Sequence, residues 1–301
     1  MIDFRHETFL EVCRIKSFTK AAEFLHITQP AVSQHIKYLE QVYGGKLFEY
    51  NGKNISLTKK GELLYEYTLK MAADSKNIKN IIEKNEVNTQ VSFGATLTIG
   101  EFILPDILAI SMNQNNKLHL NMAVENTKSL LSKIDNGDIS FAFLEGFFDK
   151  AHYGYKLFRN EQFIGVCSAK SRLSKGEYTL DDILNEKLIL REHGSGTRDI
   201  FEHFLKEKNL SRDSFNGVIE IGNMNAIKRL TEANEGITFM YYAAVKDEIH
   251  KGTLKKIDIV DFNVSHEFNF VYIKNSVLEN LYLKWFDFFN EIQTQILTTD
   301  K

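Results

Sequence analysis

Residues 19–57 read TKAAEFLHITQPAVSQHIKYLEQVYGGKLFEYNGKNISL, and this stretch decides how the chain is organised. It begins with a short helix, predicted over residues 19–26, whose apolar residues lie on one side. Thr28 is a good N-cap residue, and Pro30 lies in the first turn of the next helix, where its missing N–H costs nothing. We therefore expect a second helix over residues 29–43 after a tight turn.

The second predicted helix has one narrow apolar stripe and a polar opposite face. The stripe follows the helical spacing i, i+4, i+7 and i+11, at Val32, Ile36, Leu39 and Tyr43. The opposite face carries no carboxylate and consists of Pro30, Ser33, Gln34, Lys37, Tyr38 and Gln41. Amide, hydroxyl and amine groups hydrogen-bond to base edges and phosphates, so the pair predicts a helix-turn-helix that enters a major groove. The candidate DNA contacts are Thr28, Gln29, Pro30, Ser33, Gln34 and Lys37.

After Gly44 and Gly45 the apolar pattern changes to an alternating one. Residues 48–50 and 53–57 flank Asn51-Gly52, a dipeptide typical of a tight β-hairpin. We expect this hairpin to form a wing beside the second helix, and Lys53 joins the candidate DNA contacts. Amphipathic helix pairs are common, so the specific feature is the order of N-cap, polar helix and wing.

Residues 17–62, SFTKAAEFLHITQPAVSQHIKYLEQVYGGKLFEYNGKNISLTKKGE, resemble the N-terminal winged helix-turn-helix of LysR-type transcriptional regulators. The stretch departs from the family at Lys46, where proline is common, and at Tyr50, where arginine is usual, so Tyr50 is left out of the DNA site. The resemblance extends less tightly along the whole chain. It implies a sequence-specific regulator of transcription that binds a double-stranded DNA operator and a small-molecule effector, without a cofactor.

Composition agrees with a globular protein of two or more domains, since 43% of the 301 residues are apolar. Cys13 and Cys167 are far apart, as expected of reduced thiols in a cytoplasmic protein, and neither a signal peptide nor a membrane-spanning run is recognisable. The net charge of −3 is uneven. Residues 1–60 hold nine basic and six acidic residues, whereas the rest holds 28 and 34, so the basic excess coincides with the helix-turn-helix.

A long helix is predicted over residues 58–87, with Thr58 as its N-cap. Its seam repeats every seven residues at Leu64, Met71 and Ile78, with Tyr67, Asp74 and Ile81 between them. We expect this seam to pair with a second copy in a homodimer. Asp74 weakens a coiled-coil interpretation, so packing on a neighbouring part of the chain remains open. The resemblance also implies a dimerising linker helix and assembly to a homotetramer, and it makes RNA polymerase a further candidate partner.

The second half alternates strands and helices, which predicts a mostly parallel sheet covered by helices on both faces. One helix is expected over residues 99–113, and two crossing segments near Gln162 and His266 are expected to join two Rossmann-like lobes. The predicted fold class is multidomain α plus α/β, and the second half resembles the family's periplasmic-binding-protein-like effector domain. The predicted bounds are 1–58 for the winged helix-turn-helix, 59–87 for the linker helix and 88–301 for the effector domain, with lobe I at 91–162 and 267–301 and lobe II at 163–266.

Four predicted strand-to-helix junctions carry hydroxyl, amide or glycine residues, and such junctions are where this fold class binds ligands. Helix N-termini and a forked cation suit a small anion. The candidate effector contacts are Thr96, Thr98, Thr127, Gly194, Ser195, Thr197, Arg198 and Asn223. Thr96 and Thr127 also match positions of LysR-type effector pockets. Two alternatives stay open: such residues are ordinary N-caps, and Arg198 can pair with Asp199 or Glu202.

Enzymatic interpretations are weaker. Ser195 lies in HGSGT, which does not satisfy G-x-S-x-G because His193 stands at the first glycine. No phosphate-binding or dinucleotide-binding glycine motif and no H-E-x-x-H pair occurs, so we expect neither catalysis nor a metal site. The rival from another class is a small-molecule binding protein whose helical head binds a protein. Binding to duplex DNA that weakens steeply with salt would distinguish the two.

Overall fold

The computed structural model describes residues 2–51, 54–84, 90–260 and 262–299. The chain forms two compact units. Unit 1 contains residues 1–88 with the short segments 133–140 and 276–278, and unit 2 contains the remainder. Lys53 and the predicted boundary at residues 87 and 88 lie outside the described residues. In the part that is described, no helix is both long and apolar enough to span a bilayer.

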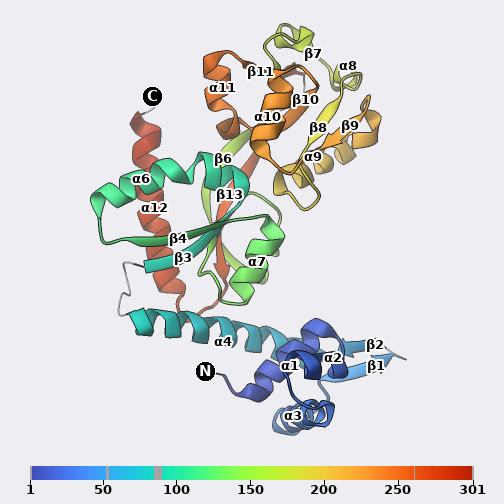
Figure 1. Ribbon diagram of the computed structural model, residues 1–301, viewed down its shortest axis with the longest axis vertical. Coiled ribbons are helices and arrows are strands. Elements are labelled where there is room, and N and C mark those ends of the chain that lie inside the picture. The colour runs from blue at the N-terminus through green and yellow to red at the C-terminus, as the bar shows by residue number, and fades with distance from the viewer. Residues whose placement is uncertain (1, 52–53, 85–89, 261, 300–301) are drawn as a thin grey trace. The chain divides into compact units, whose positions relative to one another are not determined.

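Unit 1 contains the predicted helix-turn-helix and hairpin (Figure 1). Its elements are α1 (Phe4–Ile15), α2 (Phe18–Phe24), α3 (Gln29–Val42), β1 (Phe48–Asn51), β2 (Asn54–Leu57) and α4 (Lys59–Lys84). The strands pair in register from Phe48↔Leu57 to Asn51↔Asn54. The last pair joins Asn51 to Asn54, whereas the Asn51-Gly52 signal predicts that Asn51 belongs to the turn.

The core of the helix-turn-helix is built on the predicted stripe of α3. Val32, Ile36 and Leu39 are all buried and pack with apolar residues of α1, α2, β1 and α4. Thr28 caps the helix, because its hydroxyl accepts a hydrogen bond from the N–H of Ala31, at 3.4 Å. The prediction for Tyr43 is wrong: it follows the end of α3, is 41% exposed, and its hydroxyl lies 2.9 Å from Nε2 of His6.

Helix α4 begins as predicted but its seam is different. Thr58 is the N-cap, since its hydroxyl accepts from the N–H of Gly61 at 3.0 Å. The six predicted seam residues do not share one free face, because Leu64 belongs to the helix-turn-helix core whereas Tyr67 is exposed. The apolar residues that α4 exposes are instead Leu63, Tyr67 and Ile82.

Asp74 explains the polar position in the predicted seam. Its carboxylate is buried and accepts hydrogen bonds from the Ser276 hydroxyl, at 2.5 Å, and from the N–H of Val277, at 3.1 Å. Close by, Gly137 has φ +65°, and a Cβ there would lie 2.8 Å from Cα of Ala73. The alternative that the sequence left open is therefore realised at Asp74, which contacts another part of its own chain.

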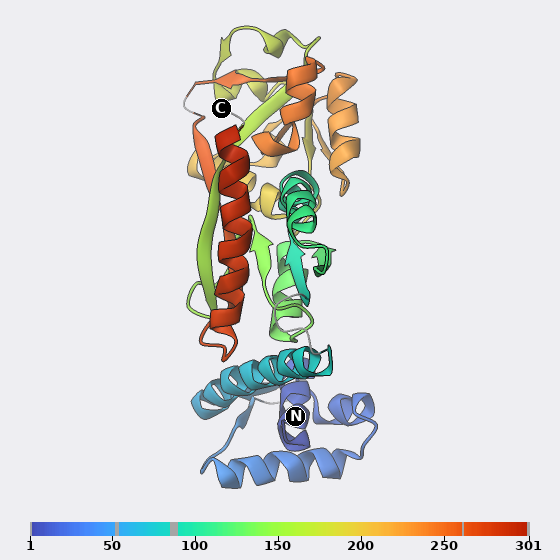
Figure 2. The ribbon, with the colours of Figure 1, turned by 90° about the vertical axis from the view of Figure 1, so that its left-hand side faces the viewer.

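Unit 2 is an α/β structure around one long mixed sheet (Figures 1 and 2). The sheet has the strand order β4-β3-β5-β13-β6-β10-β8-β9, with β11 paired to β6. The strands are β3 (Gln90–Ala95), β4 (His119–Val124), β5 (Ala142–Leu144), β6 (Tyr153–Ser168), β8 (Leu188–Leu190), β9 (Val218–Glu220), β10 (Ile237–Tyr241), β11 (Leu254–Lys256) and β13 (Val264–Ile273), and a separate pair is formed by β7 (Glu177–Tyr178) and β12 (Asp258–Ile259).

Helices cover this sheet in two groups, which define the lobes used below. Lobe I is built on β3, β4 and β5, with α5 (Leu97–Phe102), α6 (Leu104–Gln114), α7 (Thr127–Asp135) and α12 (Glu279–Thr299). Lobe II is built on β8 to β11, with α8 (Leu180–Ile183), α9 (Gly196–Glu207), α10 (Met224–Glu232), η3 (Tyr242–Ala244) and α11 (Lys246–Lys251). The last residues of α7 belong to unit 1.

The two predicted crossing segments are the long strands β6 and β13. They run antiparallel and pair where the crossings were expected, at Gln162↔Ser265 and Glu161↔His266. The prediction of a mostly parallel sheet holds inside each lobe, where β3 pairs parallel with β4 and β5, and β8 with β9 and β10. It fails at the crossing, since β6 is antiparallel to β13, β10 and β11.

The single helix predicted over residues 99–113 is wrong. Two helices, α5 and α6, are separated at Ile103, whose φ of −122° is not helical. Pro105 explains the break, because proline has no N–H to donate to the carbonyl four residues earlier, and it fits the first turn of a new helix. The break matters for the site, because α5 becomes a short helix that begins directly after Thr96.

Candidate nucleic-acid interface and effector site

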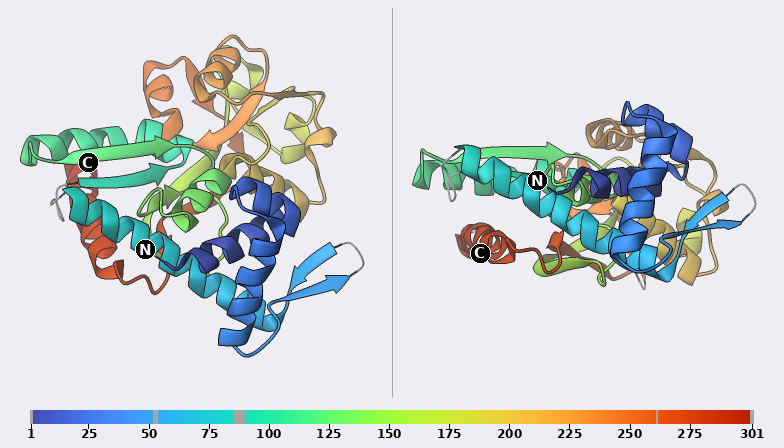
Figure 3. Two further views of the ribbon diagram at one scale, coloured as in Figure 1. Left: turned by 60° about the horizontal axis from the view of Figure 1, so that its bottom comes forward. Right: turned by 90° about the horizontal axis from the view of Figure 1, so that it is seen from below.

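Helix α3 presents the predicted polar face to solvent. Gln29, Gln34 and Lys37 are exposed, as are Thr28 and Pro30 at the start of the helix, and Ser33 is half-buried. The wing β1–β2 extends away from the three short helices (Figure 3). All six described candidates on this helix are therefore accessible from one side, as a major-groove contact requires.

Two interactions organise this face. Gln29 donates from Nε2 to the hydroxyl of Ser33 at 2.9 Å, which orients both side chains one turn apart. Arg5 of α1 lies with its guanidinium 4.0 Å from the ring centre of Tyr38 and forms an ion pair with Asp3 at 2.9 Å. Because cation–π contacts fix a guanidinium without removing its charge, Arg5 is held beside α3 as a candidate phosphate contact.

The one carboxylate in the sequence of α3 is already engaged. Glu40 accepts from the backbone N–H of Leu47 at 3.1 Å and pairs with Nζ of Lys46 at 2.8 Å. Its charge is thereby used to fix the connection to the wing. Lys46 stands where proline is common in the family, and its ion pair with Glu40 holds this connection in place.

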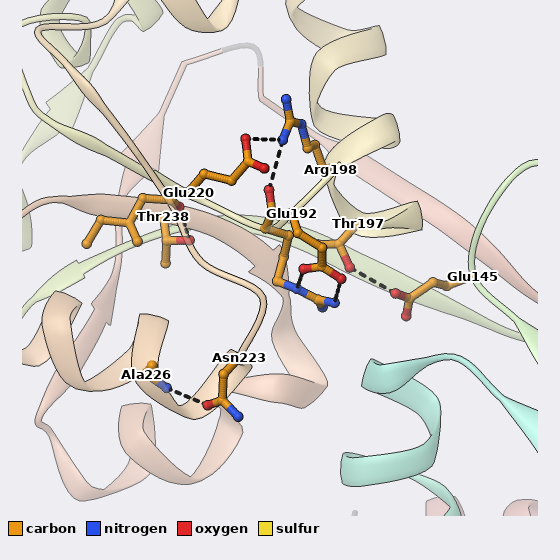
Figure 4. Close-up of polar contacts among 10 residues, drawn as sticks. Glu145, Glu192, Thr197, Arg198, Glu220, Asn223, Ala226 and Thr238 are labelled. Carbon is orange, nitrogen blue, oxygen red and sulfur yellow. Dashed lines mark hydrogen bonds and ion pairs between the residues drawn. The ribbon is translucent and has the colours of Figure 1, made fainter. Parts of the chain in front are cut away.

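In unit 2 the candidate effector residues gather around a carboxyl group that the sequence analysis did not select. Glu145 directly follows β5 of lobe I and is 2% exposed. Its Oε1 accepts from the hydroxyl of Thr197 in α9 of lobe II, at 2.8 Å (Figure 4). Its main-chain oxygen accepts from the hydroxyl of Tyr241 in β10, at 3.4 Å. Glu145 therefore links the two lobes.

Burial raises the pKa of Glu145, and the hydroxyls of Thr98 and Thr197 and the charge of Arg191 oppose this rise only in part. The other carboxyl oxygen, Oε2, has no hydrogen-bonding partner among the described residues. A buried carboxyl group favours its protonated form when one of its oxygens has no hydrogen-bond donor.

Four of the predicted hydroxyls lie close to Glu145. Those of Thr96 and Thr98 act on its carboxyl group and oppose the rise of its pKa. Those of Thr127 and Ser195 are buried and have no hydrogen-bonding partner within the described ranges. We call these four residues, with Glu145 and Thr197, the Glu145 cluster. Buried hydroxyls are normally bonded, so the hydroxyls of Thr127 and Ser195, together with Oε2 of Glu145, are the strongest sign of a ligand site in unit 2.

Two glycines bring the lobes into contact beside the cluster. A Cβ on Gly146 would lie 2.6 Å from Oγ1 of Thr127, and a Cβ on Gly196 would lie 3.0 Å from Cα of Gly146. The backbones of the two lobes therefore approach each other closely beside the cluster, where a larger residue would displace its neighbours.

The N-cap alternative is decided residue by residue. Asn223 is exposed and is a simple cap, because its Oδ1 accepts from the N–H of Ala226 at 2.9 Å (Figure 4). Thr96 and Ser195 stand at the caps of α5 and α9 but make no capping bond with their side chains. The first backbone N–H groups of α9 are therefore not served by Ser195.

The ion-pair alternative holds for Arg198. Its guanidinium donates to Glu202 at 2.8 Å, to Glu220 at 2.7 Å and to the carbonyl of Arg191 at 3.2 Å. Burial lowers the pKa of Arg198, but the two carboxylates outweigh this and raise it. The fork that was expected to hold an anion thus binds carboxylates of its own lobe. Gly194, at φ +87°, forms the half-exposed turn before α9.

Arg191 is the cation that the sequence analysis missed. It lies just after β8, is 4% exposed, and makes a two-bond pair with Glu192 at 2.8 Å in each bond. Its remaining Nη1 is buried without a partner in the described part of the chain. Both Arg191 and Glu145 directly follow a strand, and that position is the signal that could have identified them.

Comparison with known proteins agrees with both halves of the chain. The family described as "Bacterial regulatory helix-turn-helix protein, lysR family" matches residues 5–62, and the family described as "LysR substrate binding domain" matches residues 84–293. The chain belongs to the LysR family. It is a transcriptional regulator with an N-terminal helix-turn-helix domain and a C-terminal α/β effector-binding domain.

Several LysR-type relatives match nearly the whole chain. The HTH-type transcriptional regulator CysL of Bacillus subtilis is 27% identical over 91% of this chain and 91% of its own length. The HTH-type transcriptional activator CmpR of Synechocystis is 28% identical over 90% and 89%. Because these relatives are named as regulators, the assignment as a regulator rather than an enzyme is confirmed.

Solved structures show the same fold. Full-length BenM covers 99% of this chain and 98% of its own, with a TM-score of 0.58 and 21% identity. The regulatory domain of CcmR from Synechocystis, solved in complex with 2-PG, covers 68% of this chain and 97% of its own, with a TM-score of 0.62 and 16% identity. Within the described residues, no group of three or more His, Cys, Asp or Glu could hold a metal ion.

The raised pKa of Glu145 predicts a pH-dependent loss of stability. The neutral carboxyl is compatible with burial below the pKa of an unfolded glutamate, about 4.3, and that compatibility is lost as the pH rises through the higher folded-state pKa. Glu145→Gln should therefore remove this part of the decline in the free energy of unfolding. Urea denaturation of both proteins at a series of pH values measures it, and parallel curves would contradict it.

Proposed function

We propose that the outward face of α3 reads base edges in the major groove of an operator through Gln29, Ser33 and Gln34. Lys37 then contacts the phosphate backbone, with Lys53 of the wing as a second basic contact. The supporting observation is a carboxylate-free, exposed helix face on which Gln29 and Ser33 are already oriented by their mutual hydrogen bond. Since the target is duplex DNA, we place the protein in the cytoplasm.

We further propose that the effector is a small anion that enters the Glu145 cluster. The buried hydroxyls of Thr96, Thr98 and Ser195 and the N-terminus of α9 supply hydrogen-bond donors to it. Arg191 takes the role expected of Arg198, because its Nη1 is still free. The half of the prediction that concerned hydroxyl groups is thus retained, with a different cation.

The carboxyl group of Glu145 restricts the state in which an anion can bind. Two negative groups in contact in a buried site cannot both stay ionised. The effector therefore binds together with one proton, carried either by Glu145 or by the ligand itself. The need for a bound proton and for burial disfavours anions that remain strongly hydrated when they bind.

Binding would be coupled to the angle between the lobes, because the contact between Gly146 and Gly196 has to open. We propose that the chain forms a homodimer through its linker helix and that dimers assemble to a homotetramer, so that the change in lobe angle alters the spacing of the DNA-binding heads. The proposed domain bounds remain 1–58, 59–87 and 88–301. RNA polymerase is the proposed partner at an activated promoter.

The DNA proposal is tested by the double variant Gln29→Ala with Ser33→Ala. An operator is first selected from random duplexes with the native protein, and affinities are measured by gel shift at one salt concentration. The variant should lose about tenfold or more in affinity for the selected site, while its affinity for random duplex and its salt dependence stay the same because both residues are neutral.

The matched control for this variant is Thr294→Ala with Thr298→Ala. These residues are also neutral, have the same spacing at exposed positions of α12, and should leave both affinities unchanged. If the α3 variant kept the native ratio of affinities for selected and random duplex, the reading face would be misassigned.

The effector proposal is tested by thermal-shift measurements with sulfate, phosphate and small carboxylates. At least one anion should raise the unfolding midpoint of the native protein, and Thr98→Val, which removes a buried hydroxyl of the Glu145 cluster at constant shape, should abolish that shift and retain DNA binding. Thr231→Val is the control, because its buried hydroxyl bonds only within α10, to the carbonyl of Ile227 at 2.9 Å. An equal shift in Thr98→Val, or no shift with any anion, would contradict the proposal.

A further inference from the structure

A cavity lies in unit 2, and no residue of the Glu145 cluster lines it. It has a volume of about 440 Å³ and opens where three parts of the fold meet: lobe I, lobe II and the crossing strand β6. We call it the hinge pocket. Lobe I contributes residues of α5, α6 and the end of α12, lobe II contributes residues of α10, η3 and α11, and β6 contributes Arg159 and Glu161. Its volume is within the range of small-molecule sites.

The cations that line the hinge pocket are already in use. Nζ of Lys228 donates to Glu248 at 2.8 Å and to the carbonyl of Ala244 at 3.1 Å, and it lies 4.6 Å from the ring centre of Phe102. Arg159 forms an ion pair with Glu161. Burial raises the pKa of Glu161, and the charges of Arg159 and of Lys246, the third cation, oppose this rise only in part. Among the described lining residues, no cation is therefore free to neutralise an incoming anion.

Acceptors, in contrast, remain available. Gln293 of α12 is 4% exposed; its Nε2 donates to the carbonyl of Phe158 at 2.8 Å, while its Oε1 is buried without a partner in the described part of the chain. Oε2 of Glu248 is buried and unpartnered in the same sense. A buried acceptor without a donor costs free energy, so both oxygens favour a ligand that brings N–H groups.

Net charge points the same way. Five carboxylates line the hinge pocket against three cations, and two of the five, Glu101 and Asp106, are exposed at its rim. Phe102, Ile296 and Leu297 supply apolar surface beside them. The lining therefore combines unsatisfied acceptors, an excess of negative charge and an apolar wall.

We propose that the hinge pocket is a second ligand site and that it binds a small organic cation with several N–H donors, such as an amine or amidine on an apolar body. The cation's N–H groups bond to Gln293 and Glu248, and its apolar part lies against Phe102 and the end of α12. A ligand in this position contacts both lobes and the strand that joins them. Its binding is therefore coupled to the lobe angle, and hence reciprocally to the anion proposed for the Glu145 cluster.

Benzamidine and benzoate provide a matched pair of probes, because they share a planar shape and differ in charge and in donors against acceptors. Isothermal titration of the full-length protein should detect binding of benzamidine and not of benzoate. Gln293→Leu should weaken benzamidine by about tenfold or more. A second variant avoids the core: Glu101→Gln with Asp106→Asn changes exposed residues only and should weaken benzamidine several-fold.

Two control variants distinguish binding in the hinge pocket from binding elsewhere on the molecule. Glu177→Gln with Asp258→Asn makes the same change in net charge at exposed positions of β7 and β12 and should leave the affinity unchanged. Thr98→Val, in the Glu145 cluster, should also leave it unchanged, so this result does not depend on whether the effector proposal is correct. Absence of benzamidine binding, equal or tighter binding of benzoate, native affinity in both pocket variants, or loss of binding in Thr98→Val would each overturn the proposal.

Discussion

The buried carboxyl group of Glu145 is the constraint around which the effector-binding unit is arranged. A charge in this position is costly unless it is paired or protonated, and the chain surrounds it with hydroxyl donors rather than with a dedicated ion-pair partner. Thr197 of lobe II donates to this carboxyl group and Tyr241 of lobe II donates to the main-chain oxygen of the same residue, so Glu145 also holds the lobes together. The two glycines that meet beside it allow this close approach of the lobes. In the proposed mechanism, ligand binding therefore requires the lobes to move.

In the helix-turn-helix, the apolar face of α3 fixes the helix in its core, and the polar face is exposed for recognition. Val32, Ile36 and Leu39 fix α3 in its core, so the positions between them are free to carry side chains chosen for DNA. The Arg5–Tyr38 stack and the Gln29–Ser33 bond then reduce the number of conformations that the reading face must lose on binding. Asp74 gives α4 a fixed polar attachment to its own chain at Ser276, which a coiled-coil seam would not provide.

Local signals in the sequence were sufficient wherever structure depends on neighbours along the chain. The capping of α3 by Thr28 and of α4 by Thr58, the fit of Pro30 and the hairpin pairing are of this kind. Pairing that depends on the three-dimensional fold was not predictable in the same way. The sequence does not show that Arg198 lies next to Glu220, 22 positions away, so Arg198 was expected to be available for an anion. In the same way, Leu64 was assigned to the seam because its neighbours in the core are distant in sequence. Glu145 was not selected, although it follows a predicted strand, because only hydroxyl, amide, glycine and cationic residues were considered at the strand ends.

Proton uptake on anion binding tests the central role of Glu145 most directly. Isothermal titration of the native protein with inorganic sulfate, in buffers of different ionisation enthalpy, measures the number of protons taken up per sulfate bound. The account predicts uptake that rises toward one proton as the pH increases through the folded-state pKa of Glu145, and none in Glu145→Gln. Sulfate binding without proton uptake at every pH, or no binding at all, would contradict it.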